Sequence, residues 1–215
     1  MPSEDYQATI DSVAIVRQLS SALGGVSEPE IHMLAYLSCL LALFKGHAAA
    51  EWGYHFIRAE WGAPYSASVN EAIRTLQSAG LLRDTGISFE LTDDGITFTQ
   101  AMVSMEEHAW RTPYIDGACG SVLALPTGTV RSALGEEPSM RQAKLHKQAR
   151  RLLSEAGVDP LYRQFEALGA AVGLEVKDLL VPSVVWLSYL AETAEREEHD
   201  FLHQDSSAQS EQPAT

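Results

Sequence analysis

Hydrophobic residues recur at three- and four-residue steps along most of the chain, the spacing that places them on one face of an α-helix. In the first such stretch, from 10 to 23, the regularly spaced apolar residues are Ile10, Val13, Val16 and Leu19. Gly24-Gly25 interrupts the pattern, because consecutive glycines favour a break in a helix. The sequence therefore predicts an N-terminal helical segment within residues 1–26.

A stronger helix-start signal follows at Ser27. Glu30 lies three residues further on, the spacing of a capping box in which the hydroxyl and the carboxylate each satisfy a free backbone N–H group. An almost continuous apolar run leads from there to Lys45. We therefore expect a largely buried helix over 28–45.

Aromatic residues crowd the next stretch. Trp52 and its aromatic neighbours recur at helical steps and predict a second helix over 48–60, which Gly62-Ala63-Pro64 must end. Residues at that spacing are expected in the core. If Trp61 and Tyr65 are exposed, however, they indicate a partner-binding groove, because aromatic anchors dominate interface energetics.

The periodicity changes at Gly80, which is suited to end a helix in the left-handed conformation. Before it, a third helix is expected from about Ser66 to Ser78, with its buried face at Val69, Ile73 and Leu76. After it, apolar and polar residues alternate as in a half-buried strand, with the apolar positions at Ile87, Phe89 and Leu91. The turn signal Asp84-Thr85-Gly86 makes this a β-hairpin.

Beyond the hairpin the pattern again favours helices, over 97–110, 140–156, 160–172 and 182–201. Residues 111–138 are rich in Gly, Pro and Thr, so we expect an irregular connector with a domain boundary. The last residues, 204–215, lack an apolar face and are expected to form a disordered tail.

The stretch from Ser68 to Gly95 resembles the recognition helix and wing of winged helix-turn-helix proteins. In that superfamily a small residue and a glycine often end the third helix, apolar residues then pack under a hairpin, and a glycine closes a Leu-Thr turn. The matching residues here are Ala79-Gly80, Leu81-Leu82 and Leu91-Thr92-Asp93-Asp94-Gly95.

This resemblance covers about 27–105 and implies a mainly α fold with a small β-hairpin. It places a winged-helix domain at 27–110 and, after the connector, a C-terminal helical extension at 139–203. A narrower similarity is to accessory subunits of bacterial ATPase-linked defence and toxin-antitoxin systems. It is carried by Trp61-Gly62-Ala63-Pro64-Tyr65-Ser66 and by the helical extension, and it implies a protein partner such as a large ATPase.

In the usual docking mode of winged helices the third helix enters the DNA major groove. Arg74 and Gln77 are then the side chains expected to reach DNA. The formal net charge of -14 opposes this contact, because neutralisation of phosphates by Lys and Arg supplies most non-specific affinity. We expect DNA contact to be local, or these side chains to be simply the solvated face of the helix.

A basic segment stands out against this acidic background. Five of the 15 Lys and Arg residues fall within eleven positions, at Arg141, Lys144, Lys147, Arg150 and Arg151. On one helix over 140–156, Lys144, Lys147 and Arg151 align on the side opposite the apolar residues. This stripe is either a solvated face or a contact for nucleic acid or an acidic partner surface.

The stretch from 181 to 190 is apolar around most of a helix circumference, with Val185, Trp186 and Tyr189 as its largest candidates for partner contact. Such a helix needs cover from its own core or from another subunit.

Neither a catalytic nor a metal-binding constellation is evident. His199 and His203 have helical metal-ligand spacing but no evident third ligand, and adjacent residues such as Glu107 and His108 point in different directions on a helix. Cys39 and Cys119 do not indicate a disulfide framework. We expect no enzyme, metal or cofactor.

The acidic N-terminus lacks the order of a secretory signal, and the longest apolar stretch, 33–44, is well short of the roughly twenty residues that cross a bilayer. A cytoplasmic protein without membrane contact is therefore expected. The first hypothesis for its function is an accessory or scaffold subunit that binds protein partners, with auxiliary DNA contact. The alternative is a homodimeric transcription regulator that recognises DNA with residues 66–79.

Overall fold

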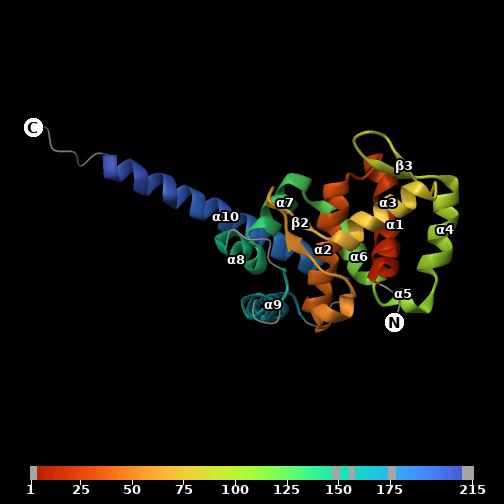
Figure 1. Cartoon of the computed structure of the whole chain (residues 1–215). Helices are drawn as coiled ribbons and strands as arrows, with labels where there is room; N and C mark the ends of the chain where they lie inside the picture. The colour runs from red at the N-terminus through yellow and green to blue at the C-terminus, as the bar shows by residue number, and fades with distance from the viewer. Residues whose placement is uncertain (1–3, 147–150, 155–157, 174–177, 210–215) are drawn as a thin grey trace, which may run out of the picture.

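A computed structural model gives the fold of the chain and describes residues 4–146, 151–154, 158–173 and 178–209 (Figure 1). The predicted mainly helical class is confirmed, and the described residues form two small antiparallel hairpins instead of one. In chain order the elements are α1 (Glu4–Leu23), α2 (Glu28–Phe44), the 3-10 helix η1 (Ala49–Trp52), β1 (Ile57–Arg58), β2 (Pro64–Tyr65), α3 (Ala67–Ser78), β3 (Leu82–Asp84), β4 (Phe89–Leu91), α4 (Asp93–Val103), α5 (Glu106–Ala109), α6 (Thr112–Ala124), α7 (Thr127–Gly135), α8 (Pro138–His146), α9 (Asp159–Val172) and α10 (Leu180–Gln209).

The helix α2 forms the centre of the core. All its residues from Ile31 to Phe44 are buried, because α1, α3, α6 and α9 pack around it. Its start follows the sequence signal: the Glu30 carboxylate accepts hydrogen bonds from the backbone N–H of Ser27 at 2.8 Å and from the Ser27 hydroxyl at 2.7 Å. The predicted helix over 28–45 is therefore confirmed.

The helix α3 packs against α1, with its predicted apolar face buried. Gly80 then adopts the left-handed conformation, with φ of +70°, and the chain turns into the β3–β4 hairpin. Val26 forms an antiparallel bridge with Phe89, so the link between α1 and α2 lies along the hairpin edge. The prediction for Ile87 is wrong: this side chain is exposed at the turn, because β4 begins only at Phe89.

The prediction of a helix over 48–60 is wrong. One turn of 3-10 helix ends where Gly53 adopts a φ of +87°, and the chain then extends into β1, which pairs with β2. Trp52 and Phe56 are both buried, as expected. Their helical spacing reflects a loop that inserts aromatic side chains into the core.

The prediction of an irregular connector over 111–138 is also wrong, since α6 and α7 occupy most of this stretch. Gly117 explains how α6 fits between α2 and α10: a side chain there would meet Leu41 and Leu179. The helix predicted over 97–110 begins earlier and is divided into α4 and α5. It begins earlier because the Thr92 hydroxyl accepts a hydrogen bond from the N–H of Gly95 and caps α4.

The C-terminal helices follow the predicted order with different ends. The helix predicted over 140–156 is too long, because Arg151 bridges to Ile57 of β1 and Leu153 has a positive φ of 58°. The helix α10 extends beyond its predicted end to Gln209, and its C-terminal half projects away from the body (Figure 1). The predicted tail is therefore helical up to that residue, and 210–215 lie outside the described residues. Among the helices that the structure describes, none combines the length and hydrophobicity needed to cross a membrane.

Candidate functional site

The outer face of α3 carries the two side chains expected to reach DNA. Arg74 is exposed and forms no ion pair within the described part of the chain. Gln77 is half-buried, and its amide nitrogen lies 3.5 Å from a carboxylate oxygen of Asp84. Glu71 is exposed on the same helix. The structure therefore presents one unpaired cation on this described face, next to acidic groups.

The hairpin beside α3 offers a phosphate little attraction. Arg83 forms an ion pair with Glu90 across the two strands, and Asp84 accepts a hydrogen bond from the N–H of Gly86 at 2.7 Å. Asp93 and Asp94 are exposed in the first turn of α4. The described side chains of this hairpin thus pair their cation internally and leave carboxylates at the surface.

The basic stripe predicted over 140–156 is not assembled on one helix. Arg141 and Lys144 lie on α8, where they face Glu136 at 3.6 and 3.7 Å. Arg151 lies beyond the helix and contacts the imidazole Nδ1 of His55 at 2.7 Å. Lys147 lies outside the described residues. The prediction that these cations share one face is wrong for Arg151, because this residue forms a β-bridge with Ile57 of β1 and is not part of α8.

The β1–β2 hairpin displays an exposed aromatic residue. Trp61 is 69% exposed, and its ring makes an edge contact with Tyr65, with 6.1 Å between the centroids. Tyr65 in turn packs on the buried ring of His32 at 4.7 Å. Trp61 is therefore exposed, as the partner-contact prediction requires, whereas Tyr65 is half-buried and supports the Trp61 ring from below.

The second predicted partner surface lies on α10. Val185 and Tyr189 are 41% and 53% exposed, and Val181, one turn earlier, is 50% exposed. Trp186 is buried instead: its indole N–H donates to Gln164 of α9 at 3.1 Å, and its ring packs against Phe165. Trp186 thus joins α9 to α10, while the other three side chains form a row on the surface.

An apolar cavity of about 210 Å³ opens beside this row, in the angle between α9 and α10. Its lining is Gln164, Ala167, Leu168, Ala171, Val185, Trp186 and Tyr189. In Figure 1 α9 is seen nearly end-on while α10 runs across the view, so the two helices cross steeply. The small alanine side chains of α9 leave the hollow that the crossing creates.

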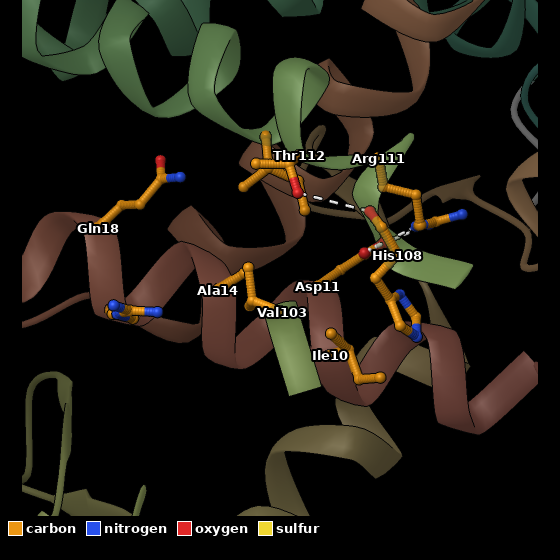
Figure 2. Close-up of a pocket in the computed structure, with 10 residues that line it drawn as sticks. Ile10, Asp11, Ala14, Gln18, Val103, His108, Arg111 and Thr112 are labelled. Atoms are coloured by element: carbon orange, nitrogen blue, oxygen red, sulfur yellow. Dashed lines mark hydrogen bonds and ion pairs between the residues drawn. The ribbon is translucent and has the colours of Figure 1, made fainter. Parts of the chain in front are cut away.

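A larger and more polar cavity, of about 300 Å³, lies between α1, α4 and the start of α6 (Figure 2). Gln18 lies at one end and His108 at the other, with Ala14 and Val103 between them. The amide of Gln18 donates to Asp116, whose pKa is raised by burial.

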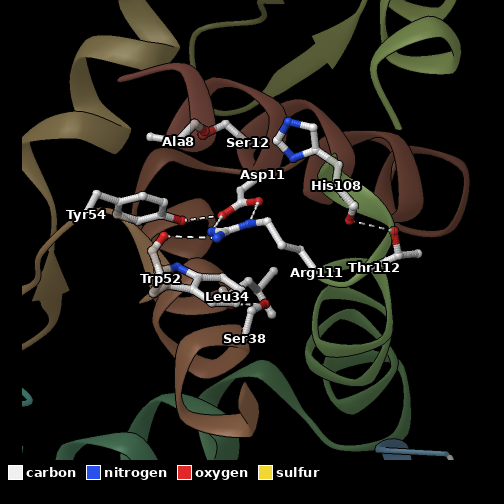
Figure 3. A network of polar contacts seen from close by, with 10 residues as sticks. All are labelled: Ala8, Asp11, Ser12, Leu34, Ser38, Trp52, Tyr54, His108, Arg111 and Thr112. Carbon is white, nitrogen blue, oxygen red and sulfur yellow. Dashed lines mark hydrogen bonds and ion pairs between the residues drawn. The ribbon is translucent and has the colours of Figure 1, made fainter. Parts of the chain in front are cut away.

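The most extensive polar network in this region surrounds Arg111 (Figure 3). Its guanidinium pairs with Asp11 through two nitrogens, donates to the carbonyl oxygen of Trp52 at 2.9 Å, and lies over the Trp52 ring. The Tyr54 hydroxyl also donates to Asp11, at 2.7 Å. Burial lowers the pKa of Arg111, but the charge and hydrogen bonds of Asp11 outweigh it and raise the pKa.

This network holds α1, η1 and the start of α6 together. It does not resemble a catalytic pair, because the guanidinium of Arg111 and the carboxylate of Asp11 already satisfy each other's charge and hydrogen-bonding groups. Sequence reasoning missed it. The only signal was an aspartate, Asp11, next to the apolar face of the first helix. Arg111 gave none, because it lies in the stretch predicted to be irregular.

A second buried carboxyl group, Glu137, caps the start of α8. It accepts hydrogen bonds from the Tyr36 hydroxyl at 2.6 Å and from the N–H groups of Ser139 and Met140 at 2.8 and 2.6 Å. Burial raises the pKa of Glu137 to about 7, against the lowering effect of these bonds. Its contacts are all within the core, so its role is to join α8 to α2.

The described residues contain no group of three or more His, Cys, Asp or Glu side chains placed to hold a metal ion. Cys39 and Cys119 are free thiols, and burial raises the pKa of both. Comparison with family models, curated proteins and solved structures found no match.

Proposed function

We propose that the chain is a non-enzymatic accessory or scaffold subunit, built on a winged-helix module, that binds a protein partner through α10. The row formed by Val181, Val185 and Tyr189 carries this proposal. Isolated exposed apolar residues are ordinary, whereas contiguous ones indicate interaction sites. Here three of them stand one turn apart beside an apolar cavity.

The order of elements supports the winged-helix part of the proposal. Two helices, a third helix and a hairpin follow one another, and the Val26–Phe89 bridge adds a short third segment to the hairpin edge. The β1–β2 hairpin inserted before α3 presents Trp61 as a further anchor. The similarity to accessory subunits of bacterial ATPase-linked systems makes a large ATPase the first partner to test.

A dimeric transcription regulator is the second candidate, and the exposed Arg74 on α3 favours it. Specific DNA binders of this kind typically make roughly six to ten phosphate contacts. The acids that engage Gln77 and Arg83 reduce the number of side chains that α3 and its hairpin can contribute. For this reason we place DNA contact second.

Site-specific photo-crosslinking in the native cells tests the first proposal. A benzophenone amino acid replaces Tyr189 in one variant and Ile87, an exposed residue of the β3–β4 turn, in the control. We expect one protein to be crosslinked at 189 and not at 87, and expect Val185→Glu to abolish that product. A partner captured equally at both positions contradicts the proposal.

Light scattering of the purified chain with duplex DNA separates the two candidates. The accessory subunit should not bind the duplex at physiological salt. A stable dimer that binds it there, and loses binding on Arg74→Ala, would establish the regulator instead.

A further inference from the structure

The exposed row on α10 has the dimensions of a short helix contact. Val181 and Tyr189 are eight residues apart, which corresponds to about 12 Å along a helix axis. Val185 lies between them, and Ala167 and Ala171 border the cavity beside it. A partner helix lying along this row can place one apolar side chain in the cavity and others on the row.

The charge of α10 is divided sharply along its length. No charged residue occurs from 180 to 191, whereas the remainder of the helix, from Glu192 on, contains six acidic residues and one arginine. Arg196 is paired with Glu192 at 3.1 Å, both side chains being exposed. The apolar row is thus followed by a strongly acidic segment of the same helix.

The first two acidic residues of this segment, Glu192 and Glu195, are exposed. Figure 1 shows that the C-terminal half of α10 leaves the body and is not covered by the other described helices. A ligand that starts on the apolar row can therefore continue along the acidic segment without meeting another part of the described chain. Charge complementarity requires that this continuation be basic.

We infer that the α10 surface binds a partner segment that forms an amphipathic helix, apolar at the end that contacts Val181–Tyr189 and rich in Lys and Arg at the other end. This inference rests on the proposed function and specifies the chemistry of the partner. A helix satisfies its own backbone hydrogen bonds, so it can lie on an apolar surface without unpaired polar groups.

A second copy of the chain fits this surface poorly. In an antiparallel pair centred on Val185, the acidic segment of each copy would extend past the start of the other α10, where the sequence has Lys177 beside Asp178 and no run of basic residues. In a parallel pair the two acidic segments would face each other. The parallel arrangement brings like charges together, and the antiparallel one gives the acidic segments no basic surface to pair with, so neither supplies charge complementarity.

A peptide display experiment tests the inference on the full chain. The library consists of helix-forming peptides with randomised residue types at every position, and selection uses the wild-type chain with counter-selection on Val185→Glu and Tyr189→Glu. We expect the enriched peptides to be apolar in one half and basic in the other. Enrichment of acidic peptides, of peptides without this order, or of none at all would overturn the inference.

Binding of an enriched peptide is then measured by fluorescence anisotropy. Tyr189→Glu should weaken binding about tenfold or more, as expected for an anchor residue, and Glu195→Lys should weaken it and reduce its salt dependence. Ile87→Ser, which removes an exposed apolar side chain elsewhere, should leave it unchanged. An affinity that Glu195→Lys leaves unaltered would overturn the basic half of the inference.

The crosslinking experiment distinguishes a failure of the proposed function from a failure of the inference about the chemistry of the partner. If a protein is crosslinked at position 189 but its contacting segment is acidic or not helical, the proposed function stands and the inference fails. If the crosslinked product is a second copy of the chain, both the partner and its inferred chemistry are wrong.

Discussion

The guanidinium of Arg111 and the carboxylate of Asp11 form a buried, two-pronged ion pair between residues 100 positions apart in the chain. Both side chains are only 1% exposed. The pair fixes α1 against the segment that begins α6, and the bond from Arg111 to the Trp52 carbonyl adds η1 to the same joint. Removing one member would leave the other as a buried charge without compensation.

Arg111→Met is therefore expected to lower the free energy of unfolding by about 3–5 kcal/mol, the usual cost of breaking a buried pair. Urea denaturation followed by circular dichroism measures it. The double variant Asp11→Asn, Arg111→Met leaves no unpaired charge and should recover part of the loss. If Arg111→Met unfolds within about 1 kcal/mol of the wild type, the pair does not hold these elements together.

Gly95 allows the close contact between α4 and the start of the hairpin. A Cβ atom at this position would lie against the carbonyl oxygen of Leu81, well inside van der Waals contact. Gly95→Ala should therefore destabilise the fold by about 1–3 kcal/mol, as overpacking does.

Gly128→Ala is the matched control, because Gly128 lies in α7 and nothing beyond its own turn of helix comes within 4 Å of the place that a Cβ atom would take. It should stabilise the protein by about 0.5–1 kcal/mol through the lower entropy of the unfolded chain. Equal melting temperatures for the two variants would show that α4 can move away from Leu81 at little cost.

The burial of the His32 imidazole is expected to make the protein less stable in mild acid. Burial lowers the pKa of this imidazole from 6.5 to about 4, and its Nδ1 accepts a hydrogen bond from the N–H of Ser66 at 3.2 Å. Glu28 lies 3.8 Å from the other ring nitrogen, but its exposed carboxylate does not offset the burial. The unfolded chain therefore takes up the proton at higher pH than the folded chain.

The stabilisation from neutral His32 is complete above about pH 6.5 and is lost as the pH falls towards 4, by about 3 kcal/mol in total. His32→Asn keeps an acceptor for Ser66 and cannot be protonated. The free energy of unfolding of His32→Asn should therefore rise relative to that of the wild type as the pH falls through this range. The difference between the proteins is the quantity to measure, because the raised pKa of Glu137 contributes an opposite slope to both. A difference that does not change with pH refutes this role.

The sequence predicted those parts of the fold whose signals are local. Ser27 and Glu30 marked the start of α2, and Gly80 marked the end of α3, because a cap or a left-handed turn depends on few residues. The α6 helix was missed for the opposite reason. Its glycines argue against a helix by propensity, yet Gly117 is required there for packing between Leu41 and Leu179.

The candidate site was predictable only in outline. The apolar stretch containing Val185 and Tyr189 indicated a need for cover, but which side chains face the core depends on the position of α9. The structure buries Trp186 against Phe165 and leaves Val181 on the surface. The Asp11–Arg111 pair could not be found, since it joins segments that become neighbours only through packing on α2.

Trp61 provides an optical test of whether the β1–β2 hairpin is open. Trp52 and Trp186 are buried and Trp110 is half-buried, so Trp61 should account for most of the tryptophan fluorescence that iodide can quench. Trp61→Phe should remove this quenchable fraction and shift the emission to shorter wavelength. It should change the unfolding free energy by less than about 0.5 kcal/mol, as is usual for an exposed residue.

If the variant and the wild type are quenched equally, Trp61 is already covered in the purified protein. Self-association through the hairpin would then replace a separate partner at that surface, and light scattering of the two proteins would show it.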